Sequence, residues 1–303
     1  MSPTPTRDTS AGRAHNDLRN LARRDRRDVA EYLALYTLEG FLDRLTRSPH
    51  ADDLVLKGGV LLAAFSARRP TRDIDLRATG FADDIAAVET IVGSIAAIPA
   101  DDGLVFDPGS VHAETIRDEA DYQGVRVQLT AQLASAVIAF HVDVNFGDPI
   151  WPAPVTVSLP RLLGGTVDLR GYPAHMALAE KIVTAIERGT ANTRWRDFVD
   201  IVGIAATTPI NADDLATAMA TVADHRAASL VPLVDVLAGM ATVAQPKWAA
   251  WRRKQRLNDT TPERFQDLVD ACVAFADPVL TGQTVGKTWS PTERAWVTLE
   301  RQS

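Results

Sequence analysis

Cysteine and long apolar runs are what this chain most clearly lacks. Cys272 is the one cysteine among 303 residues, so an internal disulfide framework is excluded, and we expect Cys272 to pack as a small apolar side chain. No run of about eighteen apolar residues occurs, which argues against a membrane-spanning helix. Residues 1–16 are polar and mixed in charge, without the apolar core of a signal peptide. We therefore expect a cytoplasmic protein with no membrane partner.

The chain also lacks positive net charge and any strong compositional bias. Its formal net charge of −7 excludes a protein that coats nucleic acid by bulk charge, but it is compatible with a local basic groove. Hydrophobic residues make up 46% and charged residues 23%, as in an ordinary globular protein. A chain of 303 residues is long enough for one large or two modest domains.

What the chain does contain is a Gly-Gly turn followed by a pair of carboxylates. Lys57-Gly58-Gly59 lies between two apolar runs, and thirteen residues separate it from Asp73-Ile74-Asp75. Two Asp residues at i and i+2 on a strand point to the same face, where they repel each other unless a cation lies between them. Oxygen ligands of this kind suit Mg²⁺, and the backbone N–H groups of a Gly-Gly turn suit a phosphate. Together they predict the site that nucleotidyl transfer from an NTP requires.

Each half of this pattern has an ordinary explanation when it is taken alone. Most Gly-Gly pairs are plain turns, and an Asp-x-Asp pair is commonly two solvated carboxylates on an edge strand. The combination favours a functional site, because Ile74 and Leu76 alternate with the two Asp residues. Such alternation is typical of a half-buried strand with one acidic face.

A second alternating segment, 137–145, carries another candidate carboxylate. His141, Asp143 and Asn145 share one face of the expected strand. If this strand lies beside 72–78, Asp143 becomes a third carboxylate that can share a metal ion or accept a proton from the attacking hydroxyl. The residues alone equally allow a solvent-facing Asp143. We expect His141 to be structural, because Mg²⁺ prefers oxygen ligands.

Five short segments in a fixed order resemble the AbiEii family of the DNA polymerase β-type nucleotidyltransferase superfamily. These are the nucleotidyltransferase toxins of bacterial toxin–antitoxin systems, and they include the mycobacterial MenT-like enzymes. The resemblance runs from about Tyr32 to Ile204. The segments are Leu56-Lys57-Gly58-Gly59, Arg69-Pro70-Thr71-Arg72-Asp73-Ile74-Asp75-Leu76, His141-Val142-Asp143-Val144-Asn145-Phe146, Glu180-Lys181 and Arg196-Asp197-Phe198-Val199-Asp200.

The resemblance implies a toxin-like enzyme that transfers NMP from an NTP to the 3′ end of RNA, with tRNA as the expected acceptor, and so blocks translation. It implies that Asp73, Asp75 and Asp143 hold Mg²⁺ and carry the chemistry. It also implies a cognate antitoxin protein as a partner. The further residues expected to bind the nucleotide are Lys57, Gly58, Gly59, Thr71, Arg72 and Lys181.

The sequence alone does not decide the roles of Lys181 and Thr71. In the family pattern Lys181 reaches the triphosphate and one nearby acid is essential, for which Asp197 is a better match than Asp200. The alternative is an ion pair with Arg188 or Arg196 that fixes the helix carrying Lys181. Thr71 is expected to touch a phosphate, or to accept one as an inhibitory modification from an antitoxin.

A basic segment towards the end of the chain interleaves tryptophans with cations. It contains Lys247, Arg252, Arg253, Lys254 and Arg256 within ten residues that include no acid, together with Trp248 and Trp251. Phosphate binding with base stacking, or an ordinary helix with both tryptophans in the core, explains this pattern equally well. A second basic segment, 19–27, is diluted by acids and is expected to be a solvated helix face.

Periodicity predicts an α/β protein of the α+β kind. By resemblance, its polymerase β-like mixed sheet with flanking helices precedes a C-terminal helical region. We expect a flexible segment 1–27, a nucleotidyltransferase domain 28–160, and a helical domain 161–303 that contributes Lys181 and Asp197 to the site. The expected strands are 53–56, 72–78, 104–106, 111–117, 125–131 and 137–145, and the expected helices are 28–47, 59–66, 81–98, 174–188, 194–206, 212–223, 230–242, 247–257 and 261–276. Pro262 is expected in the first turn of the last helix, and 288–293 to begin another short helix.

Other functions stay open on the sequence. A nucleotidyltransferase that modifies a protein or a small molecule would use the same carboxylates. A non-catalytic binding protein that keeps the fold is expected to have lost Asp73 or Asp75, and both are present. A helical structural protein would leave the acidic strand pair unexplained.

Overall fold

The computed structural model describes residues 6–81, 84–117 and 123–298, and the chain divides into two compact units. The first unit comprises residues 1–64, 68–148 and 155–171, and the second comprises 65–67, 149–154 and 172–303. The expected domain boundary at residue 160 differs from this division, because the segment after it adds a strand to the first unit.

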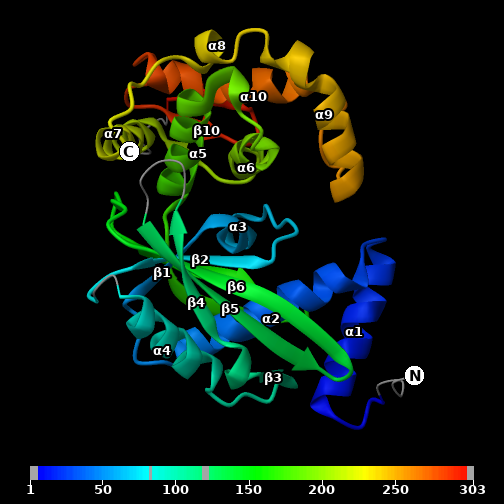
Figure 1. Ribbon diagram of the computed structural model, residues 1–303. Coiled ribbons are helices and arrows are strands. Elements are labelled where there is room, and N and C mark those ends of the chain that lie inside the picture. The colour runs from blue at the N-terminus through cyan, green and yellow to red at the C-terminus, as the bar shows by residue number, and fades with distance from the viewer. Residues whose placement is uncertain (1–5, 82–83, 118–122, 299–303) are drawn as a thin grey trace, which may run out of the picture. The chain divides into compact units, whose positions relative to one another are not determined.

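A mixed sheet forms the centre of the first unit (Figure 1). Eight described strands form it, in the order β3-β5-β6-β2-β1-β8-β7, with β4 also paired to β5. The pairs β2–β6 and β1–β8 are parallel and the others are antiparallel, so the expected mixed sheet is confirmed. The strands are β1 Leu54–Lys57, β2 Asp73–Ala78, β3 Leu104–Phe106, β4 His112–Arg117, β5 Gln123–Leu133, β6 Ala136–Asn145, β7 Val155–Pro160 and β8 Thr166–Gly171.

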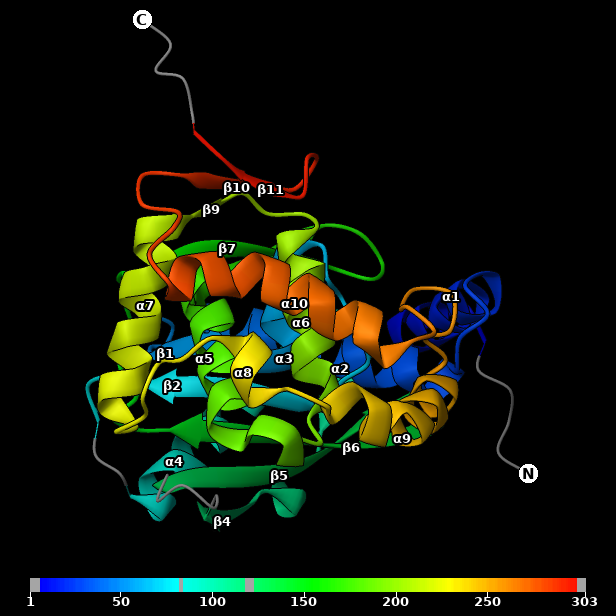
Figure 2. The ribbon, with the colours of Figure 1, turned by 90° about the horizontal axis from the view of Figure 1, so that it is seen from above.

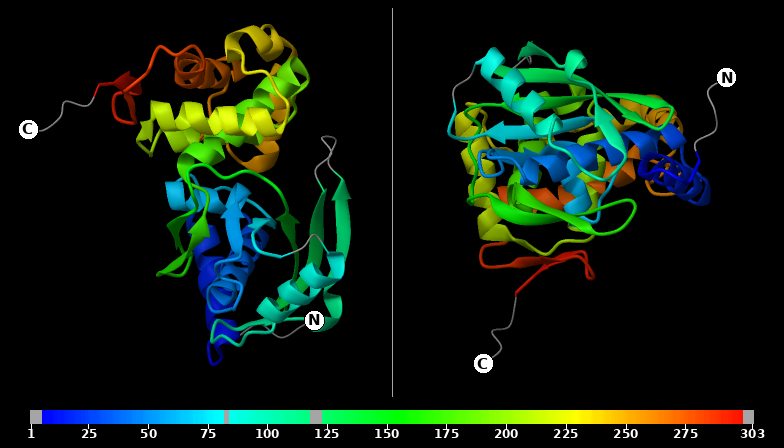
Figure 3. Two further views of the ribbon diagram at one scale, coloured as in Figure 1. Left: turned by 90° about the vertical axis from the view of Figure 1, so that its left-hand side faces the viewer. Right: turned by 90° about the horizontal axis from the view of Figure 1, so that it is seen from below.

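Helices cover the apolar face of this sheet. They include α2 (Val29–Thr46) and α4 (Ile85–Ala96), which contact β6 and β5 respectively (Figures 1 and 3). The ring of Phe41 on α2 meets the ring of Phe140 on β6 edge to face, with the centroids 6.0 Å apart. Ile74 and Val142 on this face are fully buried. Because side chains alternate along a strand, the neighbouring Asp residues are left on the other face.

The N-terminal segment contains a helix where the sequence predicted a flexible stretch. α1 (Ser10–Arg24) begins after Thr9, whose hydroxyl accepts a hydrogen bond from the Gly12 N–H. Its buried residues Ala14, Leu18 and Ala22 are spaced four apart, which aligns them on one face of a helix. This apolar stripe packs on α2 and β5, while residues 1–5 of the expected flexible segment lie outside the described residues.

The second unit is mainly helical, as expected, with a small antiparallel sheet (Figure 2). Its helices are α5 Ala174–Arg188, α6 Trp195–Ala205, α7 Ala212–His225, α8 Leu233–Val236, α9 Met240–Gln255 and α10 Phe265–Leu280, and its strands are β9 Ile210–Asn211, β10 Thr288–Ser290 and β11 Ala295–Val297. None of the described helices in either unit has the length and apolar character needed to cross a membrane.

Three local expectations about the second unit are wrong. The chain breaks between α8 and α9 at Gly239, whose φ of 76° suits glycine, so 230–242 is not one helix. α10 begins at Phe265 rather than beside Pro262, because Thr261 is bonded to the Arg252 side chain. Residues 288–293 lie in the β10–β11 hairpin, where the buried Trp289 packs on Phe275 and holds the chain extended.

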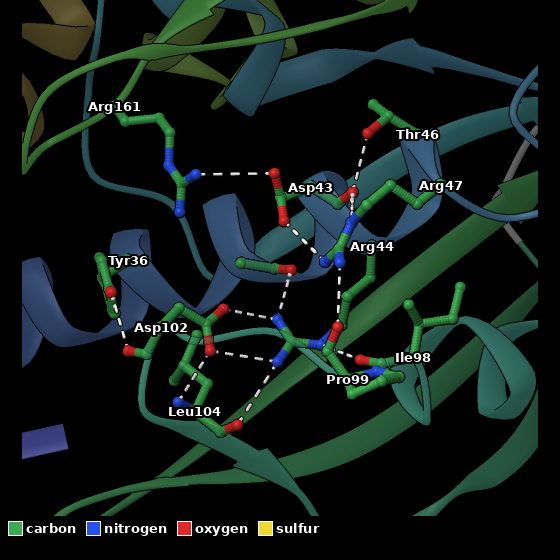
Figure 4. Close-up of polar contacts among 11 residues, drawn as sticks. Tyr36, Asp43, Arg44, Thr46, Arg47, Ile98, Pro99, Asp102, Leu104 and Arg161 are labelled. Atoms are coloured by element: carbon green, nitrogen blue, oxygen red, sulfur yellow. Dashed lines mark hydrogen bonds and ion pairs between the residues drawn. The ribbon is translucent and has the colours of Figure 1, made fainter. Parts of the chain in front are cut away.

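A buried arginine ties α2 to the loop that precedes β3 (Figure 4). The Arg44 guanidinium makes a bidentate ion pair with Asp102, at 2.6 and 3.1 Å. Its remaining N–H groups donate to the carbonyls of Ile98, Gly40 and Leu104, so all five donors are used. The Arg44 side chain is only 2% exposed, so this pairing stabilises a buried charge.

We expect the Asp102→Ala variant to lose roughly 3–5 kcal/mol of unfolding free energy, because it leaves the buried Arg44 charge unpaired. Urea unfolding measures this. Asp43→Ala is the matched control, since Asp43 pairs with the half-exposed Arg47 and should cost at most about 1 kcal/mol. Equal losses in the two variants would contradict the assigned role of Arg44.

Candidate active site

The acidic face of β2 lies as the sequence predicted. Asp73, Asp75 and Arg77 are half-buried on one face, and Ile74 and Leu76 are fully buried on the other. The side-chain period of two along a strand produces this separation. The two carboxylates therefore point in the same direction from the middle of the sheet.

The pairing register extends this acidic face across neighbouring strands. Asp75 lies opposite Asp143 on β6, and Asp73 lies opposite His141. The condition under which Asp143 becomes a third carboxylate, that 137–145 lies beside 72–78, is therefore met. On the outer sides, Lys57 of β1 lies opposite Asp75, and Arg126 of β5 lies opposite Asp143. We call Arg126, Asp143, Asp75 and Lys57 the charged row, in which two carboxylates lie between two cations.

Each carboxylate of this face has its own hydrogen-bond donor. The Arg126 guanidinium donates to both oxygens of Asp143, at 2.8 and 2.7 Å. The Thr71 hydroxyl donates to Asp73, and the Gly59 N–H donates to Asp75 at 3.3 Å. Within the described ranges, no three His, Cys, Asp or Glu side chains are close enough together to hold a metal ion. Separate donors and mutual repulsion account for the spread of the three carboxylates.

The surroundings shift two of these carboxyl groups in opposite directions. Burial raises the pKa of Asp75 to about 6, and the charges of Asp73 and Asp143 add to this effect against the attraction of Lys57. Burial acts to raise the pKa of Asp73 as well, but the Thr71 hydrogen bond, with His141 and Arg69, holds that pKa below its usual value. The free-energy cost of this acidic cluster therefore falls mainly on the ionised form of Asp75.

The Gly-Gly turn is required by the approach of β1 to Asp75. Gly58 has a φ of +68°, and a Cβ atom there would lie 1.8 Å from an Asp75 carboxylate oxygen. A side chain at Gly59 would crowd Arg69 and Thr71, at about 3.1 Å. The expected phosphate binding by Gly58 and Gly59 stays a prediction, and in this structure the Gly59 N–H faces Asp75.

Two residues of the site were missed by the sequence reading. Asp148 is 3% exposed, and its carboxylate is ion-paired with the Lys57 ammonium, which was expected to bind the nucleotide. Asp148 follows β6 after Gly147, and nothing local distinguishes it from a turn residue. Arg126 could have been found, because it alternates with the buried Val125 and Val127 and so belongs to the polar face.

Three polar residues of the loop before β2 have different contacts. Thr71 is buried at 7% exposure beside Asp73, and its modification stays a prediction. Arg72 is exposed, and its carbonyl accepts from the His141 N–H. Arg68 is ion-paired with the buried Glu39 at 2.6 Å, so it supports α2.

Lys181 lies in a buried ion-pair cluster of the second unit. Its ammonium on α5 contacts Asp197 at 3.2 Å and Asp200 at 2.7 Å, both on α6. Arg194 also pairs with Asp197, at 3.2 Å. Asp200 is 2% exposed. Lys181 is therefore no solvated surface charge, and the two acids that the sequence left as alternatives both bind it.

The basic segment of α9 combines core and surface residues. Trp248 is fully buried and its indole N–H donates to the Pro262 carbonyl, while Arg252 is bonded to Thr261 and Asn258. Trp251 is half-buried and stacks on Trp248 with the ring centroids 5.4 Å apart. The remaining cations include Lys247, Arg253 and Lys254, which are exposed and, in the described part of the chain, have no ion-pair partner.

A described cavity of the first unit does not contain this chemistry. It has a volume of about 440 Å³ and is lined by residues that include Tyr36, Asp43, Arg47 and Arg161 (Figure 4). Asp43 pairs with both arginines, and none of these side chains belongs to the charged row. The candidate active site is therefore the acidic face of β2 and β6.

A mixed sheet that presents carboxylates on adjacent parallel strands beside a Gly-Gly turn is the arrangement of a nucleotidyltransferase. A family model described as "Nucleotidyl transferase AbiEii toxin, Type IV TA system" matches residues 40–271. This match covers more than half of the 303 residues, and the chain belongs to that family of toxin–antitoxin nucleotidyltransferases. No curated protein matches the chain.

Solved structures similar to this chain include proteins from Helicobacter pylori and Paracoccidioides brasiliensis. A candidate nucleotidyltransferase from H. pylori is 14% identical with a TM-score of 0.50, covering 83% of this chain and 95% of that chain. JHP933 from Helicobacter pylori is 12% identical with a TM-score of 0.47, covering 81% and 89%. An antigenic nucleotidyltransferase-like protein from Paracoccidioides brasiliensis is 17% identical with a TM-score of 0.39, covering 64% and 88%. The first similarity supports the fold class, and the other two are too distant to add to it.

We expect Asp75→Asn to stabilise the metal-free protein at about pH 8, by roughly 1–3 kcal/mol. The pKa of Asp75 in the fold, about 6, exceeds its ordinary 3.8, so the fold loses stability as pH rises between these values. The neutral amide avoids that loss, and its advantage should vanish below about pH 4.

Thermal unfolding in EDTA between about pH 4 and pH 8 measures this effect. Asp52→Asn, which neutralises an exposed carboxyl group outside the charged row, should change little. A lower melting temperature for Asp75→Asn at about pH 8 would show that Asp75 is stabilised by its partners in the ionised form.

Proposed function

We propose that this protein transfers a nucleoside monophosphate from an NTP to the 3′-hydroxyl of RNA, with tRNA as the acceptor, and thereby stops translation. The observation that carries the proposal is the acidic face that Asp73 and Asp75 on β2 share with Asp143 on the parallel strand β6. Membership of the toxin family supports nucleotidyl transfer and an antitoxin partner, while the RNA acceptor is our inference.

The chemistry of the donor atoms on this face suits a divalent metal ion. Asp73 and Asp75 would hold Mg²⁺ and Asp143 would share it, because carboxylate oxygens are its usual protein ligands. A cation would also relieve the repulsion from Asp73 and Asp143 that adds to burial in raising the pKa of Asp75. When bound, Mg²⁺ would neutralise triphosphate charge and polarise the α-phosphate.

The residues of the chain supply binding and proton transfer. We assign Asp143 as the acceptor of the 3′-hydroxyl proton, since it lies beside Asp75 in the sheet. The 3′-oxygen then forms a bond to the α-phosphorus, the bond to the β-phosphate oxygen breaks, and pyrophosphate leaves. The backbone of Gly58 and Gly59 and the side chains of Thr71 and Arg72 would bind phosphate oxygens.

Lys181 and Asp197 enter the proposal through the family pattern. We assign the Lys181 ammonium to the β- and γ-phosphates, where a point charge offsets the charge of the triphosphate. Within the second unit, Asp197 and Asp200 contact this ammonium at 3.2 and 2.7 Å and so fix its position. Lys57, whose ammonium pairs with Asp148, contributes positive charge at the edge of the carboxylates.

The surface of α9 favours RNA as the acceptor. Lys247, Arg253 and Lys254 are exposed cations with no partner among the described residues, on a chain whose net charge is −7. Phosphate groups would neutralise these cations, and the accessible part of Trp251 could stack on a base. A protein or small-molecule acceptor gives no reason for this local excess of positive charge.

We expect the purified protein, given Mg²⁺, total RNA and each α-labelled NTP in turn, to label a tRNA-sized band. Asp75→Asn should reduce this label roughly 100-fold or more, because it removes a metal ligand. Asp52→Asn is the matched control and should retain activity. Label that appears on protein, or on no macromolecule, would overturn the RNA acceptor, and equal label in Asp75→Asn would overturn the site.

We expect the triple variant Lys247→Ala, Arg253→Ala, Lys254→Ala to bind tRNA more weakly, with a smaller salt dependence. The slope of log affinity against log salt should fall by roughly 2–3, since each lost phosphate contact removes about 0.7–0.9. Filter binding at several salt concentrations measures this. Arg23→Ala with Arg26→Ala, on the other basic segment, is the control, and an equal effect there would show that the binding is not specific to α9.

A further inference from the structure

Arg126 occupies a position in the charged row that the proposed chemistry does not use. Its Nε and Nη2 atoms donate to the two oxygens of Asp143, at 2.8 and 2.7 Å. The Asp143 side chain is 11% exposed and that of Arg126 is 35% exposed. One partner of this pair is therefore fixed in the sheet, while the other can move into water.

Charged residues near Arg126 have partners of their own. Glu114 on β4 lies opposite Arg126, but its carboxylate accepts a hydrogen bond from Gln128. At the far end of the row, Lys57 is ion-paired with Asp148. Arg126 is thus a cation in direct contact with a carboxylate of the proposed metal site, through the planar fork that suits a carboxylate.

We propose that Arg126 is an internal counter-ion of the active site, which neutralises Asp143 in the metal-free protein and leaves it when a divalent cation binds. This inference rests on the proposed function. A guanidinium and a divalent cation on one carboxylate repel each other, so each weakens the binding of the other. Because Arg126 is partly exposed, its release into solvent costs little, whereas Asp143 has no comparable freedom.

The replacement of Arg126 by a divalent cation can be distinguished from two simpler roles of Arg126. If Arg126 only supports the sheet, its removal lowers stability and leaves metal affinity unchanged. If Arg126 orients Asp143 for the metal, its removal weakens metal binding. An internal counter-ion predicts the opposite sign, because loss of its charge makes the face more negative and strengthens binding.

The test is Mn²⁺ binding to the purified full-length chain, without NTP or RNA, followed by electron paramagnetic resonance of free Mn²⁺. We expect Arg126→Gln to bind Mn²⁺ roughly tenfold more tightly than the wild type, and Arg126→Lys to fall between them. Arg47→Gln, which removes a similarly exposed cation paired with Asp43, should leave the affinity unchanged. Circular dichroism would confirm that each variant is folded.

The outcomes separate this inference from the proposed function. The counter-ion proposal alone is overturned if folded Arg126→Gln and Arg126→Lys bind Mn²⁺ no more tightly than the wild type does, while the single variant Asp75→Asn no longer binds Mn²⁺. Absence of Mn²⁺ binding to the wild type, or binding unaffected by Asp75→Asn, overturns the metal site and the counter-ion together. Tighter binding by Arg126→Gln that Asp75→Asn removes supports both.

Discussion

Repulsion between neighbouring carboxylates is the constraint on which the rest of this structure depends. Asp73, Asp75 and Asp143 lie on one face because their strands must bury the alternate residues, Ile74 and Val142 among them, on the other face. The burial of apolar side chains on one side of the sheet therefore determines that the acidic side chains lie on the other side. The surrounding donors, Arg126, Thr71 and the Gly59 N–H, are arranged to make that concentration of charge tolerable in the absence of a metal ion.

The cost of this arrangement is concentrated on Asp75. Burial raises its pKa, and the charges of Asp73 and Asp143 add to this effect. Gly58 allows the backbone to approach Asp75 where any side chain would collide. A protein selected for stability alone would place a neutral residue here. Elsewhere in the same unit the buried Arg44 charge is fully paired, with all five of its donors used. The contrast supports the proposed role of Asp75 in the chemistry.

In the second unit, the basic segment of α9 combines the two alternatives that the sequence left open, a helix packed in the core and a surface that suits phosphate. In α9 the buried Trp248 and Arg252 build the core and cap the α9–α10 loop, while Lys247, Arg253 and Lys254 remain on the surface. Helical spacing alone did not separate these roles. The buried cluster of Lys181 with Asp197 and Asp200 is similar, because an isolated lysine on a helix is usually solvated and only the packing of α5 on α6 removes it from water.

The sequence by itself determined the acidic face of β2, since the alternation of Asp73, Ile74, Asp75 and Leu76 is a local property of a strand. It also determined the family, through the order of its short segments. Only the tertiary structure decided that Arg126 and Lys57 flank the carboxylates, that Asp148 binds Lys57, and that α1 packs as a helix. Strand register and burial depend on partners far along the chain, and no local pattern contains them.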